Sequence, residues 1–155
     1  MTEIQKYIDK YCFTSEENRR FARSNFTKLV HTNARFEGVN TTLPQTQTIM
    51  DGMSVAGVPV EDVLTIVNLK RGWQYVTVQD EPLTLAMEKQ LNKIVAAEDA
   101  LVPGDLRQGQ GGVNLGGEEF FEPPLIDEQQ EQVFLQEILT DSQKTTTDKA
   151  LTVMY

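Results

Sequence analysis

The chain has 155 residues, and its 14 Lys and Arg side chains against 23 Asp and Glu give a formal net charge of −9. This length fits one domain that buries its own apolar core. The acidic balance argues against a nucleic-acid binder, which needs a basic stripe to follow phosphates, and against a polybasic membrane-surface protein. Cys12 and His31 are the only residues of their types, which excludes an internal disulfide and a cysteine-rich zinc site. Because no apolar run reaches about 20 residues and no signal-peptide pattern is present, we expect a cytoplasmic protein.

The charge is unevenly distributed. Between Glu98 and Asp141 the sequence holds eleven acidic residues and a single basic one, Arg107. Such a stretch is typical of a solvated face that keeps a protein soluble. The alternative interpretation is a docking surface for a basic partner.

The first element is predicted as one helix over residues 14–38. Thr14 or Ser15 can cap its start, and Gly38 is a natural stop. Thr42 and Gln45 then have capping-box spacing and open a short helix that we expect to end near Gly52.

The strongest helical pattern runs over residues 60–78. Its apolar positions fall on two faces, which is typical of a helix buried between neighbours. Asn68 lies within these apolar positions, so we expect its amide to find hydrogen-bond partners and to fix the packing. A further helix is predicted after Pro82.

Glycine dominates the next stretch, residues 103–112. It lacks the Gly-Lys-Ser/Thr sequence of a phosphate-binding loop and is expected to be a flexible approach to a hairpin. Gly116 and Gly117 predict a two-residue turn between short strands, within a hairpin over residues 113–121.

Two helical segments follow the hairpin. Asp127 can cap the first, with Val133, Phe134 and Ile138 predicted to face inward. The second begins near Ala150 and shows no stop signal before Tyr155. We interpret it as the start of a core helix, with a frayed terminal turn as the alternative.

Glu37 is unusual because it lies in the last turn of a predicted helix, directly before Gly38. An anion there faces the negative end of the helix dipole, which costs roughly 0.3–1 kcal/mol. The position suggests a cationic partner, but on spacing alone a solvated glutamate is the favoured interpretation. His31 stands at helical spacing with no second histidine, so a satisfied histidine at the surface or the core edge is favoured over a catalytic or metal role.

The order of these features resembles the Fic family of AMP-transferases. In that family an inhibitory helix ends in a Ser/Thr-x-x-x-Glu-Gly/Asn motif, to which the run from Asn33 to Gly38 is similar. The resemblance covers the chain from about residue 25 to residue 155. Its further elements here are Asp51-Gly52, the long helix with its internal Asn68, the Gly-x-x-Arg segment ending at Arg107, and a flap hairpin that begins at Val113.

Two departures from the family pattern matter. Asn33 stands where the inhibitory motif usually has Ser or Thr. The catalytic signature His-x-Phe-x-Asp/Glu-Gly-Asn-Gly-Arg-x-x-Arg is absent from the 155 residues, and His31 lies in the wrong element to supply it. We therefore expect a mainly α, Fic-like helical bundle with one β-hairpin, a single partial domain truncated before the catalytic loop.

The resemblance implies that the parent architecture transfers AMP from ATP, with Mg²⁺, to a hydroxyl on a target protein. It makes Asn33, Glu37 and Gly38 inhibitory, because the glutamate pairs with the second arginine of the signature and keeps it from the γ-phosphate. The flap residues that would align the target are Val113, Asn114, Leu115, Gly116 and Gly117. Arg107 and Asn68 would be structural.

For the 155 residues alone we expect no catalytic residues, no bound ATP or metal, and no AMP transfer. The expected partner is a protein target or another Fic-like chain. The alternative function is a non-enzymatic regulator or interaction module. A weaker third one is an acidic docking protein unrelated to nucleotides.

Overall fold

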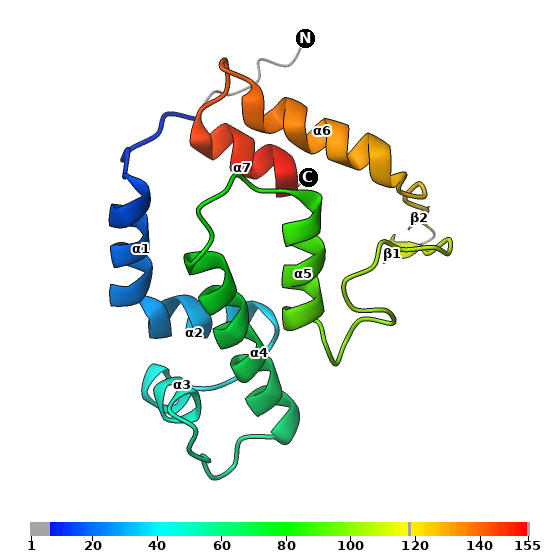
Figure 1. Ribbon diagram of the computed structural model, residues 1–155. Helices are drawn as coiled ribbons and strands as arrows, with labels where there is room; N and C mark the ends of the chain where they lie inside the picture. The colour runs from blue at the N-terminus through cyan, green and yellow to red at the C-terminus, as the bar shows by residue number, and fades with distance from the viewer. Residues whose placement is uncertain (1–6, 118, 155) are drawn as a thin grey trace. The chain divides into compact units, whose positions relative to one another are not determined.

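The computed structural model describes residues 7–117 and 119–154, and it is mainly helical with one antiparallel hairpin (Figure 1). Glu118, in the predicted hairpin, and Tyr155, at the end of the predicted last helix, lie outside the described residues. The elements are α1 (Ser15–Ser24), α2 (Phe26–Phe36), α3 (Leu43–Met50), α4 (Val60–Thr77), α5 (Leu85–Val95), β1 (Val113–Gly116), β2 (Glu119–Phe121), α6 (Glu128–Thr140) and α7 (Thr146–Met154).

Backbone contacts divide the chain into two compact units. The α2–α4 unit consists of Cys12–Pro82 and Gln90–Gly104. The hairpin unit consists of Met1–Tyr11, Leu83–Lys89 and Asp105–Tyr155.

Residues 14–38, predicted as one helix, form two helices, because the helical geometry is interrupted at Asn25. Thr14 caps α1 in a capping box with Glu17, as its sequence indicates. Asn25 leaves helical geometry at φ −113° and ψ 14°, and its side-chain amide donates to the Phe21 carbonyl at 2.9 Å. The Asn25 backbone N–H also donates to the Phe21 carbonyl, at 3.0 Å, so this carbonyl accepts two donors at the end of α1 before α2 starts at Phe26.

The core of the α2–α4 unit lies where α2, α3 and α4 meet. Val30 on α2 and Ile66 on α4 have no exposed surface, and Ile49 of α3 packs with them. The prediction that α4 is buried on two faces is wrong: Val60 is 68% exposed and Val76 is 42% exposed. α4 contacts α2 and α3, and its Gly72 lies close to Leu91 and Val95 of α5, so each of its apolar faces is partly covered and partly exposed.

In the hairpin unit α6 packs against α7 (Figure 1). Asp127 caps α6 as predicted, accepting the Gln130 backbone N–H at 2.9 Å. Ile138 is buried as expected, but its buried companion is Leu135, while Val133 and Phe134 are 58% and 48% exposed. Residues 134 and 135 are both at helical spacing from Ile138, so periodicity alone did not decide which stripe faces inward.

The N-terminal segment of the hairpin unit is tied to the start of α7. Asp9 accepts the backbone N–H groups of Thr146 and Thr147, each at 2.9 Å, and the Thr147 hydroxyl at 2.9 Å. These donors are otherwise unpaired groups of a helix start, so Asp9 acts as a cap supplied from far away in the sequence.

No helix in the described part of the chain has the length and apolar character needed to cross a bilayer.

The cap predicts a pH dependence for this contact. Hydrogen bonds, the largest from the Thr147 backbone, lower the pKa of Asp9 from 3.8 to about 2. A lowered pKa means that the cap is fully formed above about pH 4 and is lost as the pH falls towards 2. The Thr147 amide proton, followed by NMR, should titrate with a midpoint near 2. In Asp9→Ala this transition should vanish, and a midpoint near 3.8 in the unaltered chain would contradict the contact.

Candidate functional site

The C-terminal end of α2 is closed by Gly38. Glu37 is the C-cap residue, and Gly38 follows in the left-handed region at φ +84°. The Gly38 N–H donates to the Arg35 carbonyl at 3.1 Å, and the Val39 N–H donates to the Ala34 carbonyl at 3.0 Å. These two bonds form a Schellman motif, and Val39 enters the core beside Ala34. The motif therefore fixes the direction in which the chain leaves α2.

This closure leaves the Glu37 side chain exposed at the negative end of α2. Among residues 7–117 and 119–154, none forms an ion pair with it; the pairs found there are Arg19–Asp80, Arg20–Glu16 and Lys89–Glu128. The cationic partner that the sequence suggests is thus not supplied by the described chain. A cation reaching this point would meet both the carboxylate and the partial negative charge of the helix end.

Asn33, one turn before Glu37, is occupied by a different contact. Its side-chain oxygen accepts the indole N–H of Trp73 on α4 at 2.8 Å, and both residues are half-buried. The resemblance placed Asn33 in the inhibitory motif and did not connect it with Trp73. No local spacing links positions that lie 40 residues apart.

Asn68 is buried on α4, with 6% of its surface exposed, but its amide has no hydrogen bond to any described residue. The prediction that it finds partners is wrong for this part of the chain. No fully buried side-chain nitrogen or oxygen lacks a partner among the described residues, so the Asn68 polar atoms are not sealed from solvent. His31 does have a partner, the Thr41 carbonyl, which lies 2.8 Å from its Nε2.

Arg107 lies across the base of the hairpin. Its guanidinium donates to the Pro123 carbonyl at 3.3 Å and the Pro124 carbonyl at 2.8 Å, and it also reaches the Gly111 carbonyl at 3.5 Å. One planar cation thereby holds the segment before β1 to the segment after β2. The resemblance implied a structural role for Arg107, and these hydrogen bonds are its contacts in the described part of the chain.

The hairpin is short and its described residues are exposed. Val113 pairs with Phe121 and Gly116 pairs with Glu119, so Gly116 belongs to β1 and the connection begins at Gly117. The register shifts between Asn114 and Gly116, where the Asn114 side chain accepts the Gly116 N–H at 2.9 Å. Gly116 and Gly117 have φ values of +101° and +66°, which accounts for the two glycines.

ATP bound with Mg²⁺ requires metal ligands and backbone donors for its phosphates. No group of three or more His, Cys, Asp or Glu side chains comes together in residues 7–117 and 119–154 to hold a metal ion. The glycine-rich run before β1 does not open a helix, so it lacks the helix N-terminus that binds phosphates in glycine-rich loops.

Gly38 can be tested by substitution. Gly38→Ala should lower the free energy of unfolding by roughly 1–2 kcal/mol, because an L-residue is strained at positive φ. Gly109→Ala is the matched control, since Gly109 has open space around its Cα and no positive φ. Urea unfolding measures both, and equal stability of the two variants would exclude the left-handed closure of α2.

No protein-family model matches the sequence, and no curated protein matches it. The fold does match a solved structure, the crystal structure of a Fic family protein from Desulfovibrio desulfuricans G20. The TM-score is 0.62 at 18% sequence identity, over 86% of this chain and 42% of that chain. This chain therefore spans less than half the length of the protein that it resembles. The likeness establishes that the described helices and hairpin form a Fic-like fold.

Proposed function

We propose that this chain is the regulatory and target-positioning part of a Fic-type protein AMP-transferase. The observation that carries the proposal is the Fic-like fold with Glu37 exposed at the closed end of α2. In the proposed reaction the hydroxyl oxygen of a target side chain bonds to the α-phosphorus of ATP. The bond to the bridging oxygen breaks, pyrophosphate leaves, and the hydroxyl proton passes to a base outside these 155 residues.

Glu37 is the proposed inhibitory switch. Its exposed carboxylate and the negative end of α2 both favour an arginine, and an arginine–carboxylate pair can form two parallel hydrogen bonds. An arginine of the catalytic signature held in this way is withdrawn from the γ-phosphate. Gly38 contributes by fixing the helix end that presents the carboxylate.

The hairpin is the proposed target-binding element. A sheet of two strands has two open edges, and its described residues are exposed, so an extended target segment can add as a third strand. Arg107 supports this role by holding the two ends of the hairpin together.

The catalytic signature is not among the 155 residues, so the proposed AMP transfer needs a signature from elsewhere. It can come from a longer form of this protein or from a second Fic-like chain. ATP bound with Mg²⁺ would supply the AMP and the pyrophosphate leaving group. The second candidate function is a non-enzymatic interaction module, which the exposed Val133 and Phe134 on α6 favour.

The first experiment measures ATP binding to the purified chain by calorimetry with Mg²⁺. Neither the unaltered chain nor Glu37→Gly should give binding heat. Heat that appears or strengthens only in Glu37→Gly would show a nucleotide site within these residues. It would contradict the proposal that AMP transfer needs a signature from elsewhere.

The second experiment adds a separate polypeptide that carries the signature and its preceding helix, with ATP labelled at the α-phosphate. Glu37→Gly should raise AMP transfer about tenfold or more, because losing one charge-assisted pair is worth that factor. Glu81→Gly is the matched control, since Glu81 is an exposed glutamate outside the elements of the Fic pattern and should leave transfer unchanged. Association of the two chains without transfer would favour the interaction module instead.

A further inference from the structure

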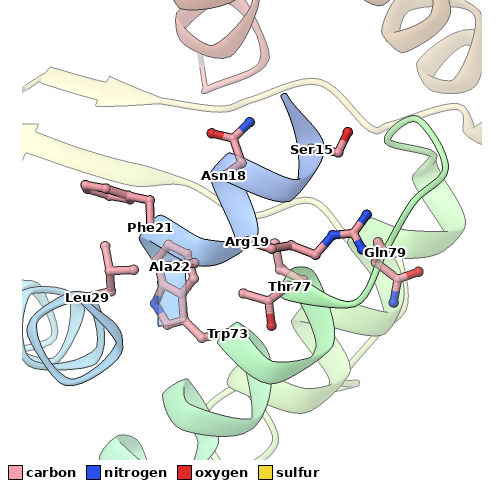
Figure 2. Close-up of a pocket in the computed structure, with 10 residues that line it drawn as sticks. Ser15, Asn18, Arg19, Phe21, Ala22, Leu29, Trp73, Thr77 and Gln79 are labelled. Atoms are coloured by element: carbon pink, nitrogen blue, oxygen red, sulfur yellow. The ribbon is translucent and has the colours of Figure 1, made fainter. Parts of the chain in front are cut away.

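A cavity of about 340 Å³ opens in the α2–α4 unit, between α1, the first turn of α2 and the last turns of α4 (Figure 2). This volume is at the small end of the range for pockets that bind small molecules, about 300–1,000 Å³. None of the proposed roles uses this cavity.

The lining is apolar in one part and polar in another. Phe21, Ala22, Leu29 and Trp73 gather together in Figure 2, and they come from α1, α2 and α4. Two of them are aromatic, so they suit a flat ring through stacking or edge contacts.

The polar part contains Arg19, Thr77 and Gln79 (Figure 2). Arg19 carries the one formal charge among the described lining residues. It pairs through one guanidinium nitrogen with Asp80, which does not line the cavity, and a guanidinium has five N–H donors. Its remaining donors can receive a carboxylate, whose geometry fits the guanidinium fork.

The cavity is also connected to the inhibitory motif. Trp73 lines it, and the same indole donates its N–H to the Asn33 side chain at 2.8 Å. Asn33 lies one helical turn before Glu37. A ring that displaces or locks the indole therefore acts on the turn that presents the carboxylate.

We infer that this cavity binds a small aromatic carboxylate, with its ring beside Trp73 and Phe21 and its carboxylate on Arg19. Binding then alters the Trp73–Asn33 hydrogen bond. The consequence for AMP transfer rests on the proposed function, but binding itself does not.

Trp73 is the single tryptophan of the chain, so tryptophan fluorescence reports on the surroundings of this one lining residue. Hydrocinnamate is the probe, and hydrocinnamyl alcohol is the control that has the same ring without the charge. Hydrocinnamate should change the fluorescence saturably and bind about tenfold more tightly than the alcohol, as expected for a charge-assisted contact. The side-chain amide signals of Asn33 should shift in parallel by NMR.

Variants then locate the probe. Val76→Phe should abolish binding by filling the cavity, while Val78→Phe, on an exposed neighbour that does not line it, should not. Arg19→Gln should reduce the affinity for hydrocinnamate about tenfold and leave that for the alcohol unchanged. Asp80→Asn breaks the same ion pair but keeps the cation, so its affinity should equal or exceed that of the unaltered chain.

Three results would overturn the inference: no saturable change, equal binding of acid and alcohol, or undiminished binding in Val76→Phe. Because none of these measurements uses AMP transfer, they fail or succeed independently of the proposed function.

Discussion

The packing of α2 on α4 is the contact on which the candidate site depends. Val30 and Ala34 from α2 and Ile66 from α4 have no exposed surface, and deleting any of these side chains would open a void in a close-packed interface. The Trp73–Asn33 hydrogen bond extends the same interface towards the end of α2. The position of Glu37 therefore follows from apolar packing that begins two turns earlier.

Local chemistry explains which parts of this fold could be predicted. The caps at Thr42 and Asp127, the long helix over residues 60–77 and the hairpin all depend on neighbours a few residues apart. Asn25 shows the limit of such reasoning, because the same polar side chain can sit within a helix or interrupt it. The choice between Phe134 and Leu135 as the buried residue depended on where α7 packs, which no local pattern contains.

The same difference between local patterns and contacts of distant residues applies to the candidate site. The end of α2 and the sharp reversal of the hairpin could be predicted from their glycines. Glycine readily adopts the positive φ values that are found at positions 38, 116 and 117. The surroundings of Asn33 and Asn68 could not be predicted. Asn33 meets Trp73 from a distant part of the sequence, and no distant residue meets the Asn68 amide in the described part of the chain. The Fic resemblance placed these residues in order but did not give their contacts.

The cap of α7 by Asp9 has a consequence for how the protein forms. The two partners are 138 residues apart, so the ribosome must synthesise the chain past Thr147 before they can meet. The helices around Val30 and Ile66 need only the first half of the sequence and can pack while synthesis continues. The hairpin unit must then close a loop of 138 residues through this cap, so we expect it to form after the α2–α4 unit.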